Sequence, residues 1–323
     1  MRKEIILAII AGSLLGLVIA FGVWRANIAL TPKKEENTKQ EEVIINEQVD
    51  LVIASPESGV VLTSTPGKVS GITKPGNFVA ILGEEDDAIV AADESGKFTG
   101  EIKLIGGLNE ITVYSFDQSD GQKSESLLVA YSTQLGQTSK EDESEESATN
   151  EADAVRAKVQ QKASEAANKP IFYMGSVTDI TEKSIQMKNG DGEIKQISVD
   201  DATQFVKVAA ETKTATFDDT AIGDFIIAMG YSNGNGVLTA RRIIITTQPA
   251  KTTRKAVIGK VTEITGKKVT VSSGDQTRTL EFGKSWEGPE ISELEEDMQV
   301  ITTGETEDST VSVRTLFIVP QEE

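Results

Sequence analysis

The segment MGSVTDITEK at residues 174–183 returns as IGKVTEITGK at residues 258–267. Recurrence of one pattern at two places in a chain indicates a duplicated structural unit. We therefore expect two related domains, at residues 171–247 and 255–320. The six identical pairs are Gly175 and Gly259, Val177 and Val261, Thr178 and Thr262, Ile180 and Ile264, Thr181 and Thr265, and Lys183 and Lys267.

Both copies also end alike, with GDFIIAMG at residues 223–230 and DMQVITTG at residues 297–304. The second copy lacks the glycine of the Gly-Asp pair and has a shorter middle. Five or six short alternating runs in each copy, joined by hairpin turns, predict a small, partly open β-barrel. The repeated pattern is similar to a family of small β domains of unknown function that recurs in bacterial exported proteins.

Upstream of the repeats, residues 49–133 consist of short apolar runs separated by Gly, Pro, Asp and Asn. About seven such runs with turn residues between them predict an antiparallel β-sandwich. The predicted strands are Leu51–Ala54, Lys68–Thr73, Phe78–Leu82, Ile89–Ala92, Phe98–Leu104, Ile111–Phe116 and Leu127–Tyr131.

Several motifs of this region occur in a recognisable order. The pattern S-P-x-x-G at residues 55–59 precedes VSGITKPG at residues 69–76, SGKF at residues 95–98 and L-x-x-G-x-N-x-I-x-V at residues 104–113. Residues 50–132 thereby resemble the bacterial immunoglobulin-like modules that are similar to the B domain of glucodextranase. The resemblance implies a spacer, an adhesive unit or an accessory beside a catalytic domain. We also expect Asn109 to bond its own backbone and fix a hairpin corner.

Polar segments connect these domains. Residues 31–48 have mixed charges and predict a tether after the first apolar run. Residues 134–170 predict an acidic linker followed by a short exposed helix at residues 152–167, which is rich in helix formers. The fold class expected from the whole chain is mainly β.

The N-terminal 1–30 region predicts a cytoplasmic stub and a transmembrane anchor. Residues 5–24 carry no charge, and twenty helical residues rise about 30 Å, the thickness of a bilayer's hydrocarbon core. A cleaved signal peptide is the alternative, because Ala20 and Gly22 offer small residues at the two cleavage positions. We expect a single pass through the cytoplasmic membrane, with Arg2 and Lys3 inside and the bulk of the chain outside.

Composition excludes several classes of function. The chain has 323 residues, a formal net charge of −19, no Cys and no His. A strongly acidic protein is a poor partner for nucleic acid, whose phosphates require a basic surface. Without Cys or His, thiolate catalysis, histidine-dependent triads and the common zinc sites are all absent. We expect no catalytic residue, no cofactor and no bound metal, and hence no enzyme.

Acidic clusters leave two further possibilities open. A pair of carboxylates could hydrolyse glycosides, and a calcium ion could bind an acidic loop such as Asn189–Glu193. The acidic clusters at residues 84–87, 200–201, 218–219 and 295–297 fall in predicted turns, so we expect them to be solvated. Most aromatic residues occupy core positions, and Trp286 is the single candidate for contact with a ligand.

These observations favour a membrane-anchored, non-catalytic protein of the bacterial cell surface. It would space, scaffold or bind an unknown envelope protein or polysaccharide. The alternatives are a carbohydrate-binding accessory protein, a component of an export or efflux assembly, and an envelope hydrolase that uses carboxylates. An efflux adaptor usually carries a long helical hairpin, which the short run at residues 152–167 does not match.

Overall fold

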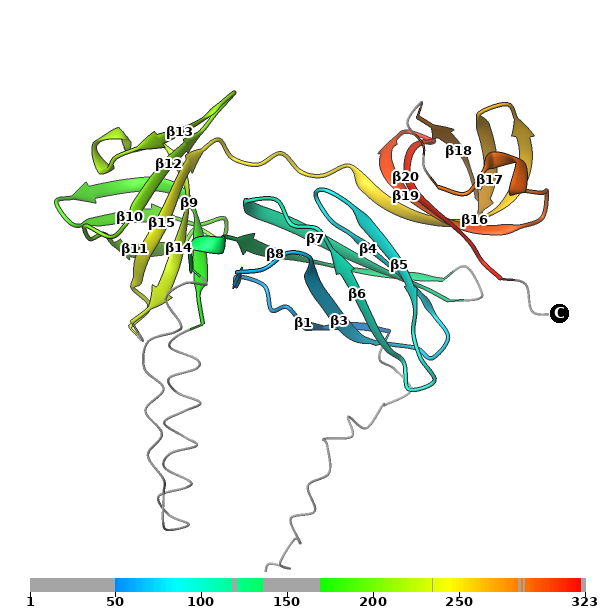
Figure 1. Ribbon diagram of the computed structural model, residues 1–323, viewed down its shortest axis with the longest axis horizontal. Helices are drawn as coiled ribbons and strands as arrows, with labels where there is room; N and C mark the ends of the chain where they lie inside the picture. Colours follow the sequence, from blue (N-terminus) through cyan, green and yellow to red (C-terminus); the bar gives the residue numbers. More distant parts are fainter. Residues whose placement is uncertain are drawn as a thin grey trace, which may run out of the picture. The chain divides into compact units, whose positions relative to one another are not determined.

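The computed structural model describes residues 50–117, 121–135, 169–233, 235–283, 286 and 288–320, which belong to one compact unit (Figure 1). The predicted anchor at residues 5–24, the tether at residues 31–48 and the short helix at residues 152–167 lie outside these residues. None of the helices in the described ranges is long and apolar enough to span a bilayer. The described chain is mainly β, as the sequence predicts.

The first module contains eight strands in two sheets. One sheet has the order β1-β3-β6 and the other has the order β2-β8-β7-β4-β5. Each of the seven predicted apolar runs overlaps a strand, and the two-residue β2 is additional. The strands are β1 (Leu51–Ser55), β2 (Val61–Leu62), β3 (Gly67–Thr73), β4 (Phe78–Leu82), β5 (Asp87–Ala91), β6 (Lys97–Ile102), β7 (Gly107–Phe116) and β8 (Gln122–Tyr131).

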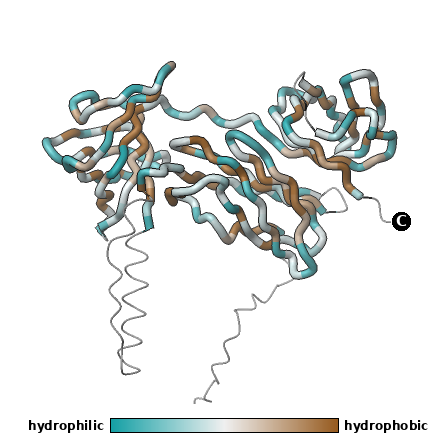
Figure 2. The backbone as a smooth tube through the Cα atoms, in the orientation of Figure 1, coloured by the Kyte–Doolittle hydropathy of each residue, from teal (hydrophilic) through white to brown (hydrophobic). Residues whose placement is uncertain are grey.

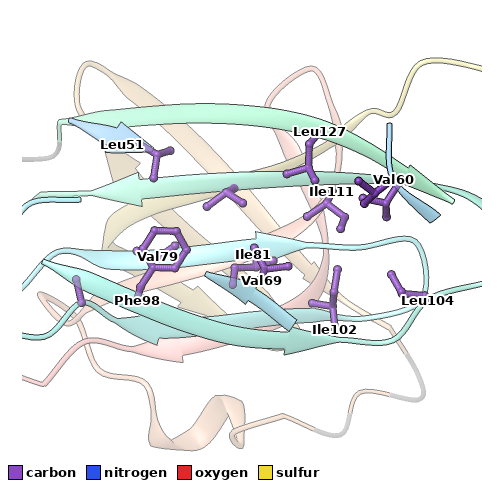
Figure 3. Close-up of a cluster of buried hydrophobic side chains, with 13 residues drawn as sticks. Leu51, Val60, Val69, Val79, Ile81, Phe98, Ile102, Leu104, Ile111 and Leu127 are labelled. Atoms are coloured by element: carbon purple, nitrogen blue, oxygen red, sulfur yellow. The ribbon is translucent and has the colours of Figure 1, made fainter. Parts of the chain in front are cut away.

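Alternation along the strands builds the core of this sandwich. In β6 every second residue is buried, because successive side chains of a strand point to opposite faces of the sheet. Figure 3 shows Val69 and Phe98 of the smaller sheet meeting Ile81 and Ile111 of the larger sheet in one apolar layer. Burying each such side chain stabilises the fold by about 1.5–3 kcal/mol.

Asn109 bonds to nearby backbone and fixes a corner, as the sequence predicts, but this corner leads from β6 of one sheet to β7 of the other and is not a hairpin. Its side chain is fully buried, and its carbonyl oxygen accepts a hydrogen bond from the Ile105 amide at 2.9 Å. Its amide nitrogen donates to the carbonyl oxygens of Ile105 and Gly107, at 2.8 and 3.1 Å. These bonds satisfy backbone groups that the turn leaves without a ladder partner.

The two C-terminal repeats form two closed five-stranded barrels (Figure 1). The strands of the first copy are β9 (Ile171–Thr181), β10 (Ser184–Lys188), β11 (Ile194–Ser198), β12 (Gln204–Val208), β13 (Thr212–Ala215), β14 (Phe225–Ser232) and β15 (Leu238–Thr246). Those of the second copy are β16 (Arg254–Thr265), β17 (Lys268–Ser273), β18 (Gln276–Phe282), β19 (Gln299–Glu307) and β20 (Thr310–Ile318).

Both barrels have the same topology. The order around the first barrel is β9-β10-β11-β15-β14, and around the second it is β16-β17-β18-β20-β19. The third and fifth strands are parallel in each copy, and the other pairs are antiparallel. A five-stranded Greek-key barrel with this order has the architecture of the OB-fold. The longer middle of the first copy is accounted for by β12 and β13, which extend its sheet beyond the barrel.

Matching residues occupy matching positions in the two barrels. Val177 and Val261 are 2% and 1% exposed and belong to the two barrel cores, which confirms that the predicted repeat aligns. Gly230 and Gly304 each lie at a β-bulge in the fourth strand. A Cβ atom there would lie 2.0 Å from the Thr239 oxygen or 2.1 Å from the Ser312 oxygen, so both bends require glycine.

Candidate functional site

The first barrel docks on the outer face of the five-stranded sandwich sheet. Its side chains Phe172, Ile227, Met229 and Ile244 pack with Val61, Ala130 and Leu135 in one buried cluster, together with the partly buried Leu108, Leu128, Met174, Val208 and Phe225. The backbones join as well, since the Phe172 amide donates to the Gly59 carbonyl at 3.0 Å. These contacts fix the first barrel against one half of the sheet.

The second barrel docks on the other half of the same sheet. Ala256, Ile258 and Ile301 pack with Ala80, Leu82 and Phe116, and the partly buried Phe78, Ile89, Tyr114, Phe317 and Val319 complete this cluster. The rings of Phe78 and Phe317 lie 5.4 Å apart. Figure 2 shows apolar residues along the strands of the sandwich. This agrees with a sheet that packs on the sandwich core with one face and on the second barrel with the other.

A polar network also joins the second barrel to the sandwich. Arg254 pairs with Glu84 at 2.7 Å and donates to the Gly83 carbonyl at 2.6 Å. Arg314 donates to the same carbonyl at 3.2 Å and lies 3.6 Å from Asp87. The network therefore ties the turn between β4 and β5 to the first and last strands of the second barrel.

Asp87 is the most deeply buried charge of this network. Its side chain is 1% exposed, and it accepts hydrogen bonds from the Thr303 hydroxyl at 2.7 Å and from the Gly83 amide at 3.2 Å. Burial raises the pKa of the Asp87 carboxyl, and the Thr303 bond and the charge of Arg314 oppose the rise. The expectation that all residues of the 84–87 cluster are solvated was therefore wrong for Asp87.

Between the two docked barrels lies a cleft of about 1200 Å³. Its floor is the outer face of β7 and β8, which contributes Leu108, Glu110, Ser126 and Leu128. One wall comes from the first barrel and the other from the second barrel. The remaining side is the connector at residues 248–253, which joins β15 to β16. This cleft is our candidate binding site.

The cleft combines an apolar wall with a charged one. Met174 and Phe225 of the first barrel line the cleft, and so does Ile105 of the sandwich, whose exposed fraction is 42%. Arg254, Glu305 and Arg314 form the wall of the second barrel. The Glu84 carboxylate, which Arg254 engages, also accepts a bond from the Glu110 amide at 3.3 Å.

The sequence did not single out these lining residues, although it contained one signal. Phe78–Leu82 is apolar at every position, a pattern typical of a strand covered on both faces. Read in this way, the run would have predicted that another module packs on the sandwich. The position of the cleft depends on contacts between segments far apart in the chain, which no local pattern encodes.

Trp286, the candidate ligand contact, lies in the second barrel beside a smaller hollow of about 460 Å³. Its indole is partly buried against the barrel core, with its ring centroid 5.0 Å from that of Phe282. The indole nitrogen donates to the Pro289 carbonyl at 2.9 Å. Trp286 is therefore separate from the large cleft, and much of its surface packs within its own barrel.

The acidic loop at residues 189–193 has local partners. Asn189, at the start of the loop considered for calcium, accepts hydrogen bonds from the Asp191 and Glu193 amides, as expected for a hairpin turn. Glu193 pairs with Lys195 at 2.8 Å, and this bond lowers the pKa of the Glu193 carboxyl. No group of three acidic side chains able to hold a metal occurs within the described ranges.

Comparison with known proteins gives only distant similarities. No protein-family model matches the chain, and no curated protein matches it. Among solved structures, a carbohydrate acetylesterase from Xanthomonas citri is 24% identical over 24% of this chain and 19% of its own, with a TM-score of 0.20. The chain thus spans about a fifth of that protein.

Two further structures cover more of the chain at lower identity. A multidomain protein with nucleic acid binding domains from Streptococcus pneumoniae is 15% identical over 47% of this chain and 46% of its own, with a TM-score of 0.14. A Drosophila Unr fragment is 10% identical over 76% of this chain and 98% of its own, with a TM-score of 0.19. Such low TM-scores carry no argument about function.

Proposed function

We propose that this chain is a membrane-anchored, non-catalytic protein of the bacterial cell surface that binds another envelope component. The apolar run at residues 5–24 would hold it in the cytoplasmic membrane, with the β modules outside. The absence of Cys and His from the sequence removes the side chains that most hydrolases and metalloenzymes depend on. The side chains that the sequence does contain suit a binding role better than a catalytic one.

The observation that supports this proposal is the docking of both barrels on one sandwich sheet. A simple spacer needs only modules linked end to end. Here two apolar clusters connect the sandwich to both barrels, and a buried ion-pair network adds to the contact with the second barrel, which begins more than 100 residues after the sandwich ends. Ordering the modules in this way costs conformational freedom, and it is useful where a surface must be presented in a fixed arrangement.

The location is tested by adding protease to cells whose outer layers are permeable to it and whose cytoplasmic membrane is intact. The acidic linker at residues 134–170 should be cut first, because its composition leaves little apolar surface to bury. The cluster around Phe172 and Leu135 should then keep the two pieces together. A C-terminal tag should stay with the membrane after cleavage and leave it only in urea.

Two results would contradict the proposed location. If cleavage requires rupture of the cytoplasmic membrane, then the modules lie inside the cell. If both pieces are released by alkaline carbonate without urea, then the apolar run is a cleaved signal peptide and the anchor is absent. As a matched control, a cytoplasmic protein of known protease sensitivity should remain intact throughout the experiment.

A further inference from the structure

We propose that the cleft between the two barrels binds an extended peptide segment of a partner protein, with a basic side chain between apolar ones. This inference rests on the proposed binding function and gives that function its site and its class of ligand. The cleft volume of about 1200 Å³ exceeds the roughly 300–1000 Å³ typical of small-molecule pockets. It therefore suits several consecutive residues of a peptide better than a single metabolite.

The guanidinium groups of the lining are already engaged. Arg254 is bound by Glu84, by the Gly83 carbonyl and by the Thr252 hydroxyl, and its side chain is 11% exposed. Arg314 is bound by the Gly83 and Glu84 carbonyls and lies close to Asp87. A guanidinium that is held in this way has few donors left for an anionic ligand.

Glu84 is paired with Arg254, but the other three carboxylates of the lining have no such partner. Among the residues that the structure describes, no cation pairs with the side chains of Glu85, Glu110 or Glu305. Lys251 is the remaining basic residue of the lining, so acidic groups exceed basic ones. A basic side chain of the ligand would complement this excess, because opposite charges across an interface favour encounter and specificity.

The apolar wall supplies the rest of the recognition. Ile105, Leu108, Leu128, Met174 and Phe225 come from both the sandwich and the first barrel. Aliphatic side chains and methionine suit the side chains of a peptide, and methionine adapts to different shapes. Sugar rings usually stack on exposed aromatic faces, and Phe225 is the one aromatic residue in the described lining. These observations favour a peptide over an oligosaccharide.

The test uses the full-length chain in mild detergent and two libraries of nonapeptides. In one library the central residue is Lys and in the other it is Glu, and the flanking positions are drawn from Ala, Val, Leu, Ser and Thr. The Lys-centred library should be retained about tenfold more strongly than the Glu-centred library at low salt. The double variant Glu110→Gln/Glu305→Gln should abolish this preference.

The matched control is Glu101→Gln/Glu307→Gln, which changes the net charge equally at exposed positions outside the lining. This control should leave the preference unchanged. Equal retention of the libraries, or a preference that survives Glu110→Gln/Glu305→Gln, would overturn the proposal. So would binding of chitohexaose or cellohexaose with no binding of the Lys-centred library. None of these results bears on the surface location, which protease accessibility measures separately.

Discussion

Ile227 and Ile301 occupy the same position in the two barrels, and both side chains pack against the outer face of one sandwich sheet. Ile227 lies opposite Met174 in the first barrel, and Ile301 lies opposite Ile258 in the second. Both isoleucines are buried, at 4% and 0% exposure, in the two clusters between modules. The duplicated domain has therefore kept its docking surface along with its barrel.

A charge placed at this surface should undock a barrel without unfolding it. Ile301→Asp would bury an unpaired carboxylate between the second barrel and the sandwich, at a cost of several kcal/mol. The barrel core on the other face of β19 keeps Val300. We expect faster proteolysis of the connector at residues 248–253, measured on the full chain, with the second barrel itself still resistant. An unchanged rate of cleavage would mean that the interface does not hold the barrel.

The buried Asp87 should make stability depend on pH. Its pKa is raised in the folded protein, so the folded state binds a proton more readily than the unfolded state between the ordinary pKa of 3.8 and the raised one. The Asp87 contribution should therefore become more favourable as the pH falls through the raised pKa, and less favourable as the pH rises.

The comparison that isolates this effect is the wild type against Asp87→Asn, which keeps the shape and removes the titration. Denaturant unfolding between pH 7 and pH 4 should show the wild type gaining stability relative to the variant as the pH falls. A difference between the two proteins that stays constant over this range would show that Asp87 keeps its ordinary pKa.

The bulge glycines should resist substitution. At Gly304 a new Cβ atom would lie 2.1 Å from the Ser312 carbonyl oxygen, which belongs to the backbone of the adjacent strand. Gly304→Ala should therefore destabilise the second barrel by about 3 kcal/mol. Gly283→Ala in the same barrel is the control, since nothing lies within 4 Å of its added Cβ atom. Equal melting temperatures for the two variants would refute the steric argument.

Asn109 should be essential to the sandwich. Asn109→Ala would remove the side chain that bonds the Ile105 amide and carbonyl, and it would leave both groups without these partners. We expect a loss of about 2–3 kcal/mol in the free energy of unfolding, measured by denaturant titration. Ser95→Ala, at an exposed turn of the same module, should cost much less. The idea fails if the two substitutions are equivalent.

The sequence alone determined the local organisation of this protein. The seven sandwich runs, the paired valines Val177 and Val261 and the corner at Asn109 were all predictable from it. The reason is physical: strand alternation, turn conformation and side-chain bonds to nearby backbone depend on residues close together in the chain. The barrel pattern occurs twice in the sequence, so agreement between the two copies strengthened the prediction of a small β-barrel.

Only the tertiary structure decided which outward faces meet. The sequence pattern predicts strands at Phe78, Leu128 and Ile227. Their burial, however, depends on contact with another module of the chain. The same contacts bury the Asp87 side chain. They also leave a cleft between the two barrels. Such arrangements are set by the free energy of burying apolar area between distant segments, which is non-directional and has no local sequence period.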